Sequence, residues 1–292
     1  MIGKQPTTVI LGLVLTCVLA LWSAGWAAAV AAAEWRHDAV WDDGNAEFCA
    51  YEIEWQRYGR GNPGTALLIA VKEPWAPDLE VKADAARPDG FEVLKLNHVR
   101  DVPTGIYTYH QMASTFVRRD TGRLQKLAVT SSEGCGVSTA QMVDSRLNTR
   151  SYFDGQGEST VDFEQGALPR DGLALVLRDF LDGPLPGEVS VFPTLMTGRF
   201  PELLARSYGI DRRIGERDVP AGSFETIELE LAPQSRGAAG WMRFAFAREA
   251  PHPLVYSEDR AGTVYRLLKC ERIPYWRMNG PEGEDWLPKA LR

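Results

Sequence analysis

GIYTYHQMASTFVRRDTGRLQKLAVTSSEGCGVSTAQMV, residues 105–143, carries the clearest structural pattern in the chain. It contains three runs rich in β-branched and aromatic residues, separated by RRDTG at 118–122 and by EGCG at 133–136. Strand-forming runs broken by charged and glycine-bearing segments are typical of antiparallel strands joined by tight turns. The stretch therefore predicts a three-stranded meander.

Strand patterns also precede this stretch. Residues 48–56 alternate apolar and polar side chains, as expected of a strand with one buried face. A turn-forming segment at 59–64 follows, and residues 65–72 (TALLIAVK) then form an uninterrupted apolar run. Such a run predicts a strand covered on both faces. Residues 91–97 predict one more strand before the meander.

Further strand patterns follow the meander. Residues 154–157 (DGQG) predict a turn between two polar strands, which we expect at a rim or an edge of the sheet. Residues 223–231 (SFETIELEL) and 241–248 (WMRFAFAR) alternate with period two. Residues 254–258 and 263–272 flank a turn and predict a closing hairpin.

One segment has a convincing helical pattern. Residues 173–181 supply an apolar stripe, Asp171 can cap its start, and Gly183 and Pro184 can end it. A second, short helix is possible around residues 201–208.

Many short strands around one helix predict a mainly β fold. We expect a large curved antiparallel sheet, a half-barrel or partly closed barrel, with one or two short helices on its concave side. Residues 34–277 are expected to form a single β-rich domain, with a possible subdivision near 165–171 into two β domains. Residues 278–292 are polar and predict a loosely ordered tail.

The first 33 residues resemble a secretory signal peptide rather than part of the fold. Lys4 is their only charged residue, residues 9–22 are apolar, and small residues lead to Ala33. These features predict cleavage near Ala33 and a periplasmic, envelope or secreted protein. An uncleaved anchor is the alternative, and it would be the sole route to membrane association because no later stretch is long and apolar enough to span a bilayer.

The composition excludes some classes of partner. The formal net charge is -7 for 292 residues, and removal of the first 33 residues, with Lys4, would leave 259 residues at -8. A mildly acidic body without a basic stripe argues against a nucleic-acid partner. The sequence also lacks a nucleotide, dinucleotide or zinc motif, so we expect no cofactor and no metal.

The cysteines predict one disulfide. Cys17 lies in the signal-like segment, and Cys49, Cys135 and Cys270 remain in the exported part. Oxidising compartments preserve disulfides, so one bridge and one free thiol are expected. The sequence does not choose among the three pairings, although a bridge from Cys135 to Cys49 or Cys270 is the favoured interpretation of Cys135.

The first half of the chain resembles an uncharacterised family of exported bacterial proteins. The resemblance depends on five short segments: RYG at 57–59, VKAD at 81–84, VLKLN at 93–97, TGIYTY at 104–109, and the Cys-Gly of SSEGCG. That family carries a bulky aromatic before the Cys-Gly and a histidine after it, whereas Gly134 and Val137 flank the pair here.

The second half, from about 173 to 276, is similar to the β half-barrel domains of lipoprotein-localisation carriers. The segments concerned are VPAGSFETIELEL, HPLVYSEDRAG and TVYRLLK followed by YW. The resemblance implies an open bowl lined with apolar side chains.

Two residues are weak candidates for catalysis. Cys135 lies between glycines in a predicted turn, where a thiol could act as a nucleophile. His110, on the preceding strand of the meander, is the nearest possible base. The plain alternatives are a half-cystine for Cys135 and a satisfied core histidine for His110. The acids Glu158, Asp162 and Glu164 could also supply a carboxylate pair, although closeness in sequence does not establish one.

The favoured functional hypothesis is an exported, non-catalytic binding or scaffold protein. Its apolar concavity would take a lipid-like or other hydrophobic small molecule, because burying each methylene of such a ligand gains about 0.8 kcal/mol. The residues expected to line it are Ile227, Leu229, Met242, Phe244 and Phe246. The alternatives are a secreted hydrolase that uses Cys135 or a carboxylate pair, and a purely structural envelope protein.

Overall fold

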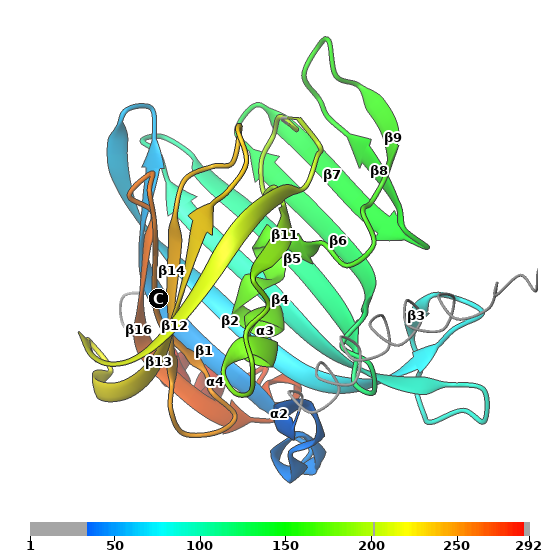
Figure 1. The fold of residues 1–292 in the computed structure, drawn as a ribbon, viewed down its shortest axis with the longest axis vertical. Coiled ribbons are helices and arrows are strands. Elements are labelled where there is room, and N and C mark those ends of the chain that lie inside the picture. The colour runs from blue at the N-terminus through cyan, green and yellow to red at the C-terminus, as the bar shows by residue number, and fades with distance from the viewer. Residues whose placement is uncertain (1–33, 201, 289–292) are drawn as a thin grey trace, which may run out of the picture.

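The computed structural model describes residues 34–200 and 202–288, and its strands form one large sheet that curves into an open, barrel-like shell (Figure 1). The prediction of a mainly β fold with a large curved antiparallel sheet is confirmed. The predicted signal peptide lies outside the described residues.

The strands are β1 (Ala46–Arg57), β2 (Arg60–Ala76), β3 (Val81–Lys82), β4 (Phe91–Pro103), β5 (Thr108–Arg118), β6 (Leu124–Glu133), β7 (Gly136–Val143), β8 (Arg146–Arg150), β9 (Glu158–Asp162), β10 (Leu168–Pro169), β11 (Glu188–Phe192), β12 (Arg206–Val219), β13 (Gly222–Pro233), β14 (Met242–Ala247), β15 (Leu254–Asp259) and β16 (Val264–Ile273).

The sheet is centred on strands from opposite ends of the chain. β1 pairs with β2 on one side and with β16 on the other, both antiparallel. The run from β2 to β9 extends the sheet in one direction, and the run from β16 back to β10 extends it in the other. Within the described residues, β9 and β10 are the two edges, and the short β10–β11 pair is parallel.

The meander predicted from residues 105–143 is present as β5, β6 and β7. The predicted polar hairpin around 154–157 is also present, and its second strand, β9, lies at an edge of the sheet. An edge strand exposes unpaired backbone groups, so polar side chains there reduce unwanted pairing with other chains.

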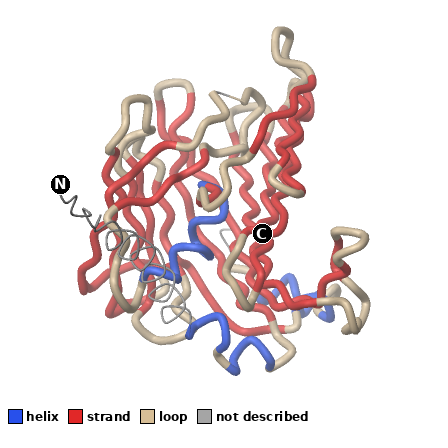
Figure 2. Tube along the Cα trace, turned by 45° about the vertical axis from the view of Figure 1, so that its right-hand side comes forward, coloured by secondary structure: helices blue, strands red, loops and turns tan. Residues whose placement is uncertain are grey.

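The helical segment lies against the concave side of the sheet (Figures 1 and 2). It consists of η2 (Arg170–Gly172), α3 (Leu173–Val176) and η3 (Leu177–Phe180), so the predicted helix is broken into three short turns. Leu173, Leu175 and Leu177 are almost completely buried among strand side chains. The face of the sheet that this segment covers is called the inner face below.

Asp171 does not cap this segment, which corrects the sequence prediction. No side-chain hydrogen bond caps η2 or α3. The Asp171 carboxylate instead accepts hydrogen bonds from the Thr194 hydroxyl and from the Leu195 N–H, the latter at 2.7 Å. Asp171 therefore bonds residues distant in sequence instead of the first turn of its own helical segment.

The outer face of the central strands carries a second, smaller core. Ala46, Phe48, Ile69 and Val71 form it, and this explains why the run at 65–72 is apolar on both faces. The helix α4 (Pro281–Trp286) covers part of this face, with the Trp286 ring 4.9 Å from that of Phe48. Trp286, in the segment predicted to be a loosely ordered tail, therefore contacts this face of the sheet.

The short helix expected at 201–208 is absent from its described residues. Residues 202–205 are irregular, and β12 begins at Arg206. The other short helical elements are α2 (Glu34–His37), η1 (Ala39–Asp42) and η4 (Tyr275–Arg277). None of the helices in the described ranges is long and apolar enough to cross a membrane.

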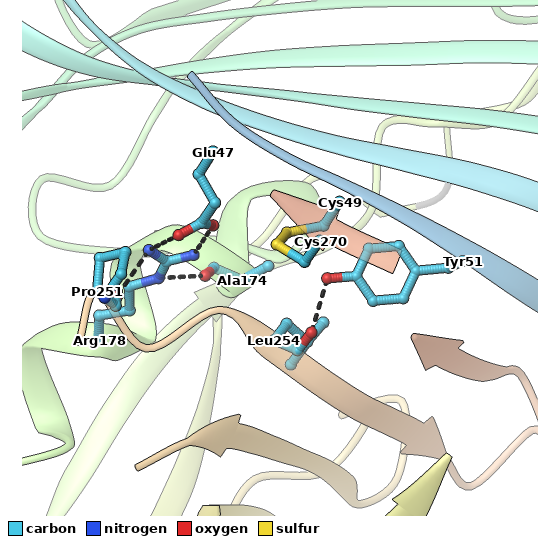
Figure 3. Close-up of a disulfide and its surroundings, with 8 residues drawn as sticks. All are labelled: Glu47, Cys49, Tyr51, Ala174, Arg178, Pro251, Leu254 and Cys270. Atoms are coloured by element: carbon cyan, nitrogen blue, oxygen red, sulfur yellow. Dashed lines mark hydrogen bonds and ion pairs between the residues drawn. A yellow bond between two sulfur atoms is a disulfide. The ribbon is translucent and has the colours of Figure 1, made fainter. Parts of the chain in front are cut away.

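A disulfide joins two of the central strands, and a buried ion pair connects β1 to the helical segment (Figure 3). Cys49 of β1 faces Cys270 of β16 in register and is bonded to it. The Arg178 guanidinium donates to both carboxylate oxygens of Glu47, at 2.6 and 3.1 Å, and to the Pro251 carbonyl at 2.9 Å. These contacts hold η3 against β1.

Loss of the disulfide should destabilise the protein. The bridge joins residues 221 positions apart, so it restricts the unfolded chain strongly. We expect a Cys49→Ala/Cys270→Ala double variant to lose about 2–4 kcal/mol of unfolding free energy in urea. Cys135→Ala is the control, because that thiol is free and exposed. An equal loss in both variants would contradict the assignment.

Removal of Arg178 should be more damaging than removal of a surface arginine. Arg178→Met leaves Glu47 as a buried charge without its partner, which costs about 3–5 kcal/mol of unfolding free energy. Arg150→Met removes an exposed pair with Glu158 and should cost less than about 1 kcal/mol. Urea unfolding of both variants measures the difference. Equal losses of unfolding free energy would show that the buried Arg178–Glu47 pair stabilises the fold no more than the exposed pair does.

Candidate functional site

A cavity of about 250 Å³ lies between the helical segment and the inner face of the sheet. β1, β4, β14, β15 and β16 contribute to its walls. Its apolar side chains are Leu68, Leu173, Met196, Met242, Phe244 and Leu254. Its polar side includes Arg57, His98, Arg100, Arg170, Asp171, Asp259 and Tyr265. This space is called the inner cavity below.

The structure divides the five residues predicted to bind a ligand. Met242 and Phe244, both on β14, line the inner cavity. Ile227, Leu229 and Phe246 do not line it. They are buried in the core cluster that also contains Met242 and the leucines of the helical segment.

His98 is held in the wall of the inner cavity by two hydrogen-bond partners. Its Nδ1 lies 3.2 Å from the Asp171 carbonyl oxygen, and its Nε2 lies 3.0 Å from the Tyr265 hydroxyl. Burial, reinforced by the nearby Arg100 charge, lowers the pKa of His98 to about 4. The imidazole is therefore neutral at neutral pH.

The acids of this wall are occupied by partners within the protein. Asp259 forms an ion pair with Arg170 at 2.6 Å. Burial raises the pKa of Asp171, whereas its hydrogen bonds from Thr194 and Leu195 act in the opposite direction.

Arg57 and Arg100 differ from Arg170, because no carboxylate oxygen of the described residues lies within ion-pair distance of either one. The Arg100 guanidinium donates through Nε to Gln111 Oε1 at 2.9 Å and through Nη2 to the Met196 carbonyl at 3.3 Å. Its Cζ lies 4.8 Å from the centroid of the Trp55 ring. The Arg57 Cζ lies 5.5 Å from the same centroid.

Neither arginine was predicted from the sequence to be a site residue. Arg57 belongs to the RYG segment that the family resemblance includes, and this was the only sequence signal pointing to it. Arg100 sits in an ordinary strand pattern. What distinguishes Arg100 is that it is buried without a carboxylate partner. Its hydrogen-bond acceptors are Gln111 of β5 and the Met196 carbonyl, both distant in sequence.

Cys135 is free and exposed, so the favoured prediction that it is a half-cystine is wrong. The reason is the sheet order, which places Cys49 opposite Cys270 and leaves Cys135 in the β6–β7 turn. The exposed His110 side chain instead contacts Asp101, with Nδ1 2.7 Å from Oδ1, rather than lying in the core. No hydrogen bond joins Cys135 to His110 in the described part of the chain.

The predicted carboxylate candidates are also separate from the inner cavity. Glu158 pairs with Arg150 at 2.6 Å on the exposed edge, and Glu164 accepts a hydrogen bond from Ser190. Asp162 lies at the end of the edge strand β9. Residues 34–200 and 202–288 contain no group of three His, Cys, Asp or Glu side chains placed to hold a metal ion. The feature that the structure assembles is a cavity with apolar side chains on one side and polar and charged side chains on the other.

The chain was compared with known protein families, curated proteins and solved structures. No protein-family model and no curated protein matches the chain. Among solved structures, it is similar to the crystal structure of a beta-barrel-like protein of the domain of unknown function DUF1849 from Brucella abortus. The identity is 11%, the TM-score is 0.46, and the match covers 78% of this chain and 97% of that chain. Similarity to lipoprotein-localisation carriers stays a prediction.

The buried His98 should make stability depend on pH. The folded protein keeps this imidazole neutral down to about pH 4, whereas an unfolded histidine takes up a proton near pH 6.5. The stability that neutral His98 contributes is therefore complete above pH 6.5 and is lost as the pH falls towards 4. The raised pKa of Asp171 acts with the opposite sign at acidic pH, but it is common to both proteins in the comparison below.

We therefore expect the unfolding free energy of His98→Gln to fall less than that of the wild type between pH 7 and pH 4.5. The difference should be about 2 kcal/mol, since one pKa unit corresponds to about 1.36 kcal/mol and this pH range covers most of the interval between the two pKa values of His98. His110→Gln, at the exposed site, should behave as the wild type. Urea unfolding at both pH values is the measurement, and parallel curves for His98→Gln and wild type would contradict it.

Proposed function

We propose that this is an exported, non-catalytic binding protein of the cell envelope, whose inner cavity holds a hydrophobic, lipid-like small molecule. The observation that carries the proposal is that Phe244 of β14, which is only partly buried, lines the inner cavity beside the buried side chains of Met242 and Leu254. Neighbouring apolar residues such as Leu229 are sealed in the core instead. The apolar wall of the inner cavity is thus continuous with the core, and it borders open space at Phe244.

Two features support export. The first 33 residues have the charged, apolar and small-residue parts of a signal peptide. The described chain contains a Cys49–Cys270 disulfide, which persists in oxidising compartments such as the periplasm. Both features agree with an envelope or secreted location.

The size of the inner cavity limits the ligand. Small-molecule pockets usually span about 300–1,000 Å³, so a space of about 250 Å³ suits a medium-length chain or one end of a longer one. Each buried methylene contributes about 0.8 kcal/mol, so several of them suffice for measurable binding without any catalytic group.

Decan-1-ol is a suitable probe for this proposal. We expect it to bind the purified protein in isothermal titration calorimetry, with a negative heat-capacity change because apolar surface is buried. Phe244→Asp places a charge in the apolar wall and should weaken binding at least about tenfold, since desolvating that charge costs more than 1.4 kcal/mol.

Val137→Asp is the matched control, because Val137 is exposed in the β6–β7 hairpin, away from the inner cavity. Circular dichroism checks that both variants are folded. Absence of decan-1-ol binding to the wild type, together with absence of co-purified lipid in native mass spectrometry, would overturn the proposal.

A further inference from the structure

We propose that Arg57 and Arg100 form an anion-binding end of the inner cavity, so that its ligand is an amphiphile with a negatively charged carboxylate or phosphate head group. This inference rests on the proposed function and adds the chemical class of the ligand. It follows from the position of the two guanidinium groups and from the way in which the other charges of the cavity are paired.

The two arginines reach the inner cavity from different strands and meet at one aromatic side chain. Arg57 comes from β1 and Arg100 from β4, and both line the cavity. Their Cζ atoms lie 5.5 and 4.8 Å from the centroid of the Trp55 ring. The indole therefore holds two like charges beside the same space, which is unfavourable unless an anion offsets their repulsion.

Neither arginine has an acid partner among the described residues. Arg100 is 8% exposed, and its hydrogen bonds go to the uncharged acceptors Gln111 and Met196. The Arg57 Nε is buried and has no hydrogen-bond partner. Aromatic rings of Trp55, Tyr58 and Tyr109 lie within 6 Å of the Arg57 Cζ and compensate its desolvation in part.

The acids of the inner cavity are already engaged. Asp259 pairs with Arg170, and Asp171 accepts hydrogen bonds from Thr194 and Leu195. Glu258 pairs with Arg243 at 3.2 Å and accepts a hydrogen bond from the Tyr256 hydroxyl. The field of Asp171 reaches Arg100 without a direct contact. The two arginines are therefore the cations of this space that remain open to an external anion.

The arrangement suits an amphiphile. Guanidinium groups match the geometry of carboxylate and phosphate oxygens and hydrogen-bond them in pairs. The cationic residues come from β1 and β4, whereas the apolar residues Met242, Phe244 and Leu254 come from β14 and β15. A ligand that spans the inner cavity would place its charged head by Trp55 and its chain against β14.

Three ten-carbon probes that differ only in the head group test this inference. In calorimetry on the full chain, we expect decanoate to bind at least about tenfold more tightly than decan-1-ol, and decyltrimethylammonium to bind most weakly. Charge-assisted hydrogen bonds to buried guanidinium groups give discrimination of this size. Decyl phosphate tests the second head group, while acetate and inorganic phosphate test whether a free anion without a chain is sufficient.

Variants connect the preference to the arginines. Arg57→Met and Arg100→Met should each weaken decanoate binding about tenfold and change decan-1-ol binding much less, so that the preference for decanoate is lost. Arg150→Met removes the same charge from an exposed edge strand and should leave both affinities unchanged. The comparison of head groups on the wild type needs no variant, so it remains decisive if an arginine variant does not fold.

The outcomes separate this inference from the proposed function. Equal affinities for decanoate and decan-1-ol would overturn the anion-binding end and leave the proposed function standing. A head-group preference that persists in both arginine variants would also overturn it, as would displacement of decanoate by acetate or phosphate at equal concentration. If neither decanoate nor decan-1-ol binds, the proposed function fails and this inference fails with it.

Discussion

The structure depends on the pairing of β1 with β16. These strands come from opposite ends of the described chain, and their antiparallel ladder joins the two strand runs into one sheet. Cys49 and Cys270 lie directly opposite each other in this ladder and are covalently linked. Without this pairing there would be two separate sheets, and neither would enclose the helical segment.

The curvature of the joined sheet creates an inner face that needs to be filled. The leucines of the helical segment fill most of it, and the Arg178–Glu47 ion pair fixes where the segment lies. Arg178 is buried with its charge compensated, whereas Arg57 and Arg100 are not compensated in the same way. The difference identifies one region of the inner face in which the protein leaves both space and charge available.

Strand patterns were predictable because period two is a local property. The meander at β5–β7, the polar hairpin β8–β9 and the closing hairpin β15–β16 follow from alternating residues and turn residues alone. The errors came from residues whose partners are distant. Asp171 accepts a hydrogen bond from the backbone N–H of Leu195 rather than capping its own helical segment. Cys135 is not in a disulfide, because Cys49 is bonded to Cys270, 221 residues away.

Local patterns were enough to predict the β-rich class, the approximate position of most strands and the presence of one buried helical segment, because side-chain periodicity and turn chemistry act over a few residues. They also placed Met242 and Phe244 on an apolar strand face. The tertiary structure alone decided which apolar residues face open space and which are sealed. It also brought Arg57 and Arg100 to the same indole, because that requires the order and curvature of strands far apart in the chain.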